Sequence, residues 1–171
     1  MLPSPSAPSS IREAPSTVKE WHFHTYWFAT RNERSGKEAQ ALREALVQQV
    51  ASDPKNFVAV CDGVTDAQLP GLTHTPPPMN HGPVGPHLSG SFETWVPAES
   101  LAQVLAWFTL HRGSLSVLVH PLTRYELEDH TTHAMWLGKP WVIDLDCLRE
   151  DLVTPPLQYP ELGFGYSASS E

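Results

Sequence analysis

The sequence predicts an α+β protein built on a ferredoxin-like βαββαβ plan, an antiparallel sheet with both helices on one face and a C-terminal extension. Two observations support this. Four short segments are rich in apolar, aromatic and β-branched residues, as strands are, and two longer segments repeat apolar residues at helical spacing. Along the 171 residues they follow one another as strand, helix, strand, strand, helix, strand.

The first strand and the first helix show these two periodicities. Residues 21–28 (WHFHTYWF) are dense in aromatic residues that favour strands. The helix after them has apolar residues at intervals of three and four: Ala39, Leu42, Leu46 and Val50. Ser35, followed three residues later by Glu38, fits a capping box, which predicts that this helix starts near Gly36.

The remaining elements have recognisable ends. Residues 57–61 (FVAVC) and 90–96 (GSFETWV) predict the second and third strands. Residues 98–111 predict the second helix, which Gly113 stops. Residues 115–120 (LSVLVH) predict the fourth strand, so the plan is complete by this point.

Segments outside the plan complete the domain organisation. Residues 1–17, rich in Pro and Ser, predict a disordered tail, and residues 18–152 form the single expected domain. Within its extension, residues 128–138 are expected as a short helix and residues 141–146 as an added edge strand. Residues 153–171 are expected to be loop and tail.

Composition excludes several functional classes. Eleven Lys and Arg against 19 Asp and Glu give a net charge of −8, and no basic run suits a nucleic-acid backbone. No apolar run approaches the roughly 18 residues of a membrane span, and the N-terminus lacks the apolar stretch of a signal peptide. Cys61 and Cys147 lie far apart, which favours a reducing, cytoplasmic setting over a disulfide framework.

Histidine is the residue type that carries the functional hypothesis, with nine in the chain. His22 and His24 are two residues apart on a predicted strand, so both project from one face. Their Cα atoms lie about 7 Å apart at the ~3.3 Å rise of a strand, and both rings can reach one metal ion. Many strands carry such a pair by chance, and only a third ligand makes it a site.

The predicted topology supplies that third ligand. The first strand is central, with the third and fourth antiparallel beside it, so His120 is expected next to His22 and Glu93 next to His24. Imidazoles plus one carboxylate on one face resemble a non-haem iron(II) triad or a zinc site. The alternatives are a solvated Glu93 and a His120 that only caps its strand end before Pro121.

Three further histidines have weaker assignments. His87 follows Gly-Pro and is expected toward the far end of the first strand, where it would contact substrate rather than metal. His130 and His133 share a face if helical and could carry protons or support the metal ligands, and a local Asp129–His130 cap is the alternative. The remaining three are expected to be surface residues: His74, His81 and His111.

Four motifs in order resemble the DOPA 4,5-dioxygenase family of fungi and bacteria: HFHTYW, GPHLSGSFETWVP, GSLSVLVHPLT and DHTTHAMWLG. The resemblance extends over residues 21–148. It implies extradiol ring cleavage of a catechol such as L-DOPA with O₂ and non-haem Fe(II), giving a seco product that cyclises to betalamic-type compounds. It also implies a compact α+β fold and a homodimer, and zinc could replace iron in the purified protein.

The family positions carried over are His22, His24, His87, Glu93, His120 and His130. We expect His22 and His120 as metal ligands, with His24 or Glu93 completing the set. His130 or His87 would act as general base or acid. Leu88 stands where family members commonly have proline, and together with the long proline-rich loop at 73–84 it bears on the substrate more than on the chemistry.

Two questions remain open at the level of the sequence: which aromatic residues line a substrate pocket, and whether the protein is an enzyme or a binding module. Tyr26, Trp27 and Trp95 could line the ring pocket, but core packing is the expected role of the two tryptophans. Another class of function is also consistent with the sequence: a ferredoxin-like dimer that binds a metal or an aromatic ligand without turnover. Catalysis requires an open position on the metal, whereas a binding module would close it.

Overall fold

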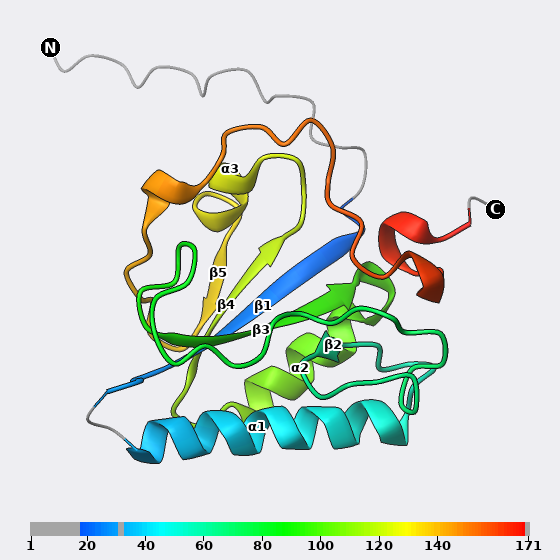
Figure 1. Cartoon of the computed structure of the whole chain (residues 1–171), viewed down its shortest axis with the longest axis horizontal. Helices are drawn as coiled ribbons and strands as arrows, with labels where there is room; N and C mark the ends of the chain where they lie inside the picture. The colour runs from blue at the N-terminus through cyan, green and yellow to red at the C-terminus, as the bar shows by residue number, and fades with distance from the viewer. Residues whose placement is uncertain (1–17, 31–32, 170–171) are drawn as a thin grey trace, which may run out of the picture.

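The computed structural model describes residues 18–30 and 33–169, so the predicted tail at 1–17 lies outside the described residues. Its centre is a five-stranded antiparallel sheet in the order β2-β3-β1-β4-β5 (Figure 1). The strands are β1 (Glu20–Trp27), β2 (Val60–Cys61), β3 (Gly90–Pro97), β4 (Ser116–Pro121) and β5 (Met135–Leu137). The first four strands have the order that the ferredoxin-like plan requires, and the predicted fold class is confirmed.

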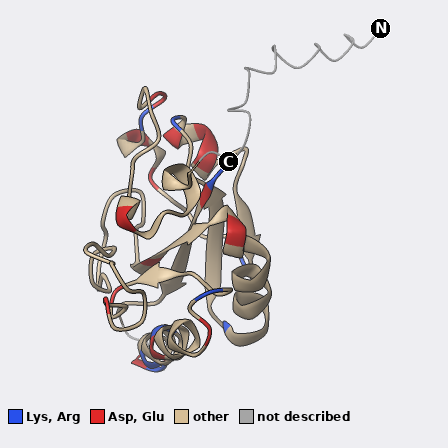
Figure 2. Ribbon diagram, turned by 90° about the vertical axis from the view of Figure 1, so that its right-hand side faces the viewer, with Lys and Arg blue, Asp and Glu red and all other residues tan. Residues whose placement is uncertain are grey.

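The helices occupy two sides of the sheet. Helices α1 (Glu33–Ser52) and α2 (Leu101–His111) lie on one face, while α3 (Glu126–His130) and the C-terminal segment lie on the other (Figure 1). Among the described residues, no helix is both long enough and apolar enough to span a bilayer. In Figure 2, Lys and Arg occupy short stretches separated by acidic and uncharged ones.

Alternation along β1 separates the core from the histidine face. Phe23 and Trp27 are at most 1% exposed and face the helices, with the Phe23 ring centroid 5.1 Å from that of Phe108 in α2. His22 and His24 point the other way, as predicted. Their face is not open, however, because loops and the C-terminal segment cover it and leave both rings buried.

The predicted capping box of α1 is wrong. The helix starts at Glu33, which places Ser35 inside its first turn rather than before it. The Ser35 hydroxyl accepts a hydrogen bond from the Phe28 amide at 3.1 Å, and so fastens the helix to the end of β1. Glu38 pairs with Arg34 instead of reaching back to the helix start.

The extension also differs from its prediction. Helix α3 ends at His130, where the Thr131 hydroxyl bonds back to the Leu127 carbonyl at 2.6 Å. The expected helix at 128–138 therefore gives way to β5, which pairs with β4. The expected edge strand at 141–146 forms only an isolated bridge, between Ile143 and His87.

The second strand is shorter than predicted, because only Val60 and Cys61 pair with β3. Val58, just before them, donates its amide to the Ser100 hydroxyl at 3.0 Å and is buried without belonging to a strand. The C-terminal segment packs back on the sheet through two short 3-10 turns, Pro160–Leu162 and Gly165–Ser167.

Candidate metal centre

Five histidines from four parts of the chain converge on one face of the sheet. The register of β1 places His22 opposite His120 and His24 opposite Glu93, as predicted from the topology. His87, in the loop before β3, brings its ring centroid to 4.1 Å from that of His24. His130, at the end of α3, lies 4.0 Å from His120 by the same measure. The cluster is therefore assembled by tertiary structure.

The nitrogen atoms within the cluster lie close enough to share an ion. His24 Nε2 and His120 Nε2 are 3.1 Å apart. Two sets of three have their ligand atoms within 4.8 Å of one another: His22, His24 and His120, and His24, His87 and His130. His24 belongs to both sets. His87 contacts Tyr26, toward the far end of β1, and its ring joins the cluster through His24.

Backbone and carboxylate acceptors fix the tautomers of three rings. His120 Nδ1 lies 2.8 Å from the Pro121 carbonyl oxygen, and His130 Nδ1 lies 2.9 Å from that of Glu126. His22 Nδ1 lies 2.8 Å from Glu93 Oε1. Because Nδ1–H donates to its acceptor, Nε2 of the neutral His120 and His130 rings keeps the lone pair that a histidine ligand needs. His22 offers the same lone pair in its neutral form.

Burial keeps the inner rings neutral. Loss of solvation, helped by the neighbouring imidazoles, holds the pKa of His24 and of His120 well below the usual value. The same causes lower the pKa of His87 to about 4, and burial lowers that of His130. Neutral imidazoles are the form that binds metal ions and accepts protons.

His22 differs because it has an acidic partner. Burial disfavours its charged form, but the Glu93 carboxylate, helped by Gln158 and Glu20, raises the pKa of His22 above its usual value. Burial likewise opposes the charge on Glu93, and His22 more than offsets it, so the pKa of Glu93 is lowered. Glu93 is therefore a hydrogen-bonded partner of His22 rather than the solvated residue of the alternative prediction.

A network behind His22 was not predicted from the sequence. The Gln158 amide lies 3.0 Å from His22 Nε2. With the oxygen and nitrogen of the Gln158 amide exchanged, the nitrogen donates to His22 and to Glu20, and the oxygen accepts from Trp95 Nε1 at 2.9 Å. Burial raises the pKa of Glu20, which is 1% exposed. Nothing in the local pattern around Gln158, which reads as a proline-rich loop, indicated this contact.

Tyr26 orients His87 and does not line the histidine cavity. Its hydroxyl lies 2.5 Å from His87 Nδ1, and its ring packs between Trp136 and Trp141 at centroid distances of 5.3 and 5.6 Å. Burial raises the pKa of Tyr26, so the hydroxyl stays protonated. Trp27 lies in the core, as expected.

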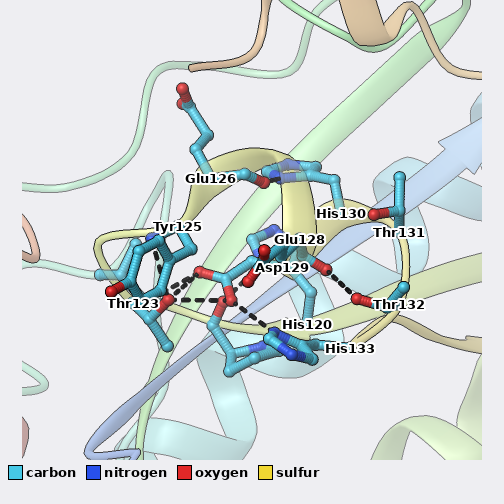
Figure 3. Close-up of polar contacts among 12 residues, drawn as sticks. His120, Thr123, Tyr125, Glu126, Glu128, Asp129, His130, Thr131, Thr132 and His133 are labelled. Atoms are coloured by element: carbon cyan, nitrogen blue, oxygen red, sulfur yellow. Dashed lines mark hydrogen bonds and ion pairs between the residues drawn. The ribbon is translucent and has the colours of Figure 1, made fainter. Parts of the chain in front are cut away.

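Asp129 holds α3 against the end of β4 (Figure 3). Its buried carboxylate accepts the Thr123 amide at 2.7 Å and the Thr123 hydroxyl at 2.8 Å. His133 Nδ1 lies 3.1 Å from the same carboxylate. Of the two histidines expected to share a helical face, only His130 points into the cluster, because the chain turns after it.

The histidine cluster forms the closed end of a cavity of about 210 Å³. Apolar side chains make up part of its wall: Pro86, Leu122, Leu148, Leu152 and Pro156. Glu126 and Arg149 line it as well. The three histidines expected at the surface do not line this cavity, and His111, for example, bonds to the Trp107 carbonyl within α2.

The donor set fits a metal ion. Two nitrogens that each bind one metal ion at about 2.1 Å, with an angle of roughly 90° at the metal, lie about 3 Å apart. His24 Nε2 and His120 Nε2 have nearly this separation, 3.1 Å. Across this buried gap His24 Nε2–H donates to the Nε2 lone pair of His120, and a metal ion would take the place of that proton. Burial keeps both rings uncharged. All-nitrogen ligation by neutral imidazoles suits iron and zinc alike.

Comparisons with known proteins found relatives along most of the chain. A model of the Dopa 4,5-dioxygenase family matches residues 21–147. A DOPA 4,5-dioxygenase of Amanita muscaria is 39% identical over 155 residues, 91% of this chain and 60% of its own length. An uncharacterized 21.2 kDa protein of Botryotinia fuckeliana is 37% identical over 76 residues, 39% of this chain and 41% of its own length.

Among solved structures, a candidate dioxygenase from Nostoc punctiforme shares the fold. It superposes with a TM-score of 0.57 at 23% identity, covering 75% of this chain and 90% of its own. This likeness supports the architecture alone. The chain spans 60% or less of the length of the two curated relatives.

Proposed function

This chain belongs to the Dopa 4,5-dioxygenase family, and on that premise we propose that it is an extradiol ring-cleaving dioxygenase. Its proposed substrates are O₂ and a catechol such as L-DOPA, and its proposed cofactor is a non-haem Fe(II) ion. The ring-opened product, a seco-DOPA, has the composition of the catechol plus one O₂. Cyclisation to a betalamic-type compound releases one water.

The observation that supports this proposal most is the buried histidine cluster at the closed end of a cavity. A catechol is flat and largely apolar, with two adjacent hydroxyls. Leu122, Leu152 and Pro156 provide an apolar wall for its ring, and the neutral histidines face its hydroxyls. The cavity thus combines ring binding with proton acceptors and metal ligands in one place.

We propose that His22, His24 and His120 hold the metal. The sequence left His24 and Glu93 as alternatives for the third ligand, and the 2.8 Å contact between Glu93 and His22 Nδ1 favours Glu93 as the residue that orients His22. Gln158, now bonded to His22 Nε2, gives way to the metal in this assignment. Bound Fe(II) supplies open coordination positions and the redox chemistry that reaction with O₂ requires.

His87 and His130 are the proposed acid and base. Burial keeps both neutral, so either can accept a proton from a catechol hydroxyl and return it later to the opened ring. The Tyr26 hydroxyl holds the His87 ring at Nδ1, which leaves Nε2 to face the site. The carbonyl of Glu126 does the same for His130.

Metal retention by alanine variants tests the ligand assignment. His22→Ala, His24→Ala and His120→Ala are expected to lose iron after anaerobic loading and desalting. His87→Ala and His130→Ala should keep iron and lose turnover. His111→Ala, on α2 and bonded to Trp107, is the matched control and should behave as the parent protein. If iron were lost from the His87 and His130 variants instead, the second set of three would be the ligands.

The alternative function has a distinct signature. A non-catalytic binding module would retain the metal and bind L-DOPA without consuming O₂. We further propose that the protein acts as a homodimer, which light scattering of the metal-loaded protein would test.

A reducing, cytoplasmic setting suits both ferrous iron and the two free cysteines, Cys61 and Cys147.

A further inference from the structure

We propose that Glu126 and Arg149 form a recognition site for the amino-acid end of the substrate, with the Arg149 guanidinium binding a carboxylate and the Glu126 carboxylate binding an ammonium. This inference rests on the proposed function and deepens it. It assigns to the chain a preference for catechols that carry a zwitterionic side chain over catechols that carry none.

Position along the cavity is the first support. His24 and His120 lie at the buried end, 5% and 2% exposed. The side chains of Glu126 and Arg149 line the same cavity but are 29% and 73% exposed, which places them at its open end. A catechol whose hydroxyls meet the histidines would therefore direct its ring substituent toward this pair.

The charges are the second support. Arg149 Nε lies 3.6 Å from Glu126 Oε2, so one positive and one negative group stand side by side. An α-amino acid carries its ammonium and carboxylate on one carbon, at a similar spacing. Among the described residues, the recorded contact of this guanidinium is through Nε, which leaves its terminal nitrogens for a bidentate bond to a carboxylate.

Backbone bonds keep the pair in place. The Arg149 amide donates to Glu126 Oε2 at 2.9 Å, and the Leu127 amide donates to the Arg149 carbonyl at 3.1 Å. These bonds tie the segment after the 3-10 turn Leu145–Cys147 to the start of α3. Because α3 also carries His130, the recognition site and the catalytic site share one support.

A neighbouring ion pair provides a matched control. Arg124 and Asp151 join the same two parts of the chain, and the Leu152 amide donates to the Arg124 carbonyl at 2.7 Å. Arg124 does not line the cavity. Replacing the Arg124 side chain thus removes a comparable ion pair between the same two segments but no contact with substrate.

The experiment compares Arg149→Gln, Glu126→Gln and Arg124→Gln on four catechols, with the iron-loaded protein. The catechols are L-DOPA, 3,4-dihydroxyphenylpropionate, dopamine and 4-methylcatechol, which carry both charges, the carboxylate alone, the ammonium alone and neither. Glu126→Gln keeps an oxygen that can accept the Arg149 amide. Anaerobic calorimetry of the same ligands on the metal-loaded protein gives binding constants that do not depend on turnover.

The expected pattern follows the charges. Arg149→Gln should lower kcat/KM and affinity about fivefold for the two carboxylates, since its guanidinium is largely exposed before the substrate binds. Glu126→Gln should lower both about fivefold for the two amines, as expected of an exposed pair. Arg124→Gln should leave all four catechols within about twofold of the parent.

Other patterns overturn the proposal. Equal losses on all four catechols, or losses as large in Arg124→Gln, would show that the pair only supports the fold. Equal affinity of the parent protein for L-DOPA and 4-methylcatechol would also refute it. If no catechol were cleaved, the proposed function would fail, and the calorimetric pattern alone would decide the recognition site.

Discussion

Replacing Tyr26 with phenylalanine removes a single hydroxyl that lies 2.5 Å from His87 Nδ1. Tyr26 is 1% exposed and His87 is 7% exposed, so water cannot readily replace the lost partner. An unsatisfied buried polar group costs about 1–3 kcal/mol. For a domain of this size each kcal/mol lowers Tm by about 2–4 °C, and we expect a decrease of about 4–8 °C at the middle of that range.

Tyr26→Phe should also lower kcat. Without the hydroxyl, the His87 ring is free to turn, and we expect kcat to fall about tenfold, less than the roughly 10²–10⁴-fold that complete loss of a general base costs. Iron content should not change. Thermal denaturation and steady-state O₂ uptake measure the two effects.

Tyr166→Phe is the control, because the Tyr166 hydroxyl donates to the Leu122 carbonyl at 2.7 Å without touching a histidine ring. It should lose stability and keep kcat. A Tyr26→Phe variant with unchanged kcat and Tm would refute the role assigned to this contact.

Three further outcomes are expected. Glu93→Gln should weaken iron binding about 10- to 100-fold, measured by competition with a chelator, because His22 loses its charged partner; equal affinity would contradict the assignment. Gly90→Ala should cost about 2–3 kcal/mol in urea unfolding, since a Cβ there would collide with the buried Trp27 ring, whereas Gly82→Ala meets nothing within 4 Å and should stay near neutral. Iron at about 100 times its Kd should add about 2.7 kcal/mol to the free energy of unfolding, and His24→Ala should abolish that gain; a gain that survived would place the metal elsewhere.

The register of the sheet was the most predictable part of the site. With 21–28 as the central strand, antiparallel pairing alone predicts His120 beside His22 and Glu93 beside His24, and both neighbours are confirmed. The four motifs likewise predicted the family, which is confirmed. Periodicity of two fixes the face on which a strand residue lies, so such predictions depend on few assumptions.

Contacts made by irregular segments could not be predicted in the same way. Gln158 reaches His22 from a proline-rich stretch with no periodicity to place it. Helix α3 and β5 were misjudged because residues 128–138 are short enough for a single turn at Thr131 to decide their structure. The capping box failed because Ser35 bonds to the strand before it, a choice that tertiary packing makes.

The buried histidines are proposed to hold iron for the ring cleavage of a catechol by O₂. Mass spectrometry of the product, after anaerobic iron loading and addition of L-DOPA and O₂, distinguishes this reaction from simple oxidation. We expect one O₂ consumed per L-DOPA, and a product with the mass of L-DOPA plus O₂, or that mass less one water after cyclisation. His24→Ala should give none of it. A product with an intact ring and two hydrogens fewer, formed with release of hydrogen peroxide, would rule out ring cleavage by this site.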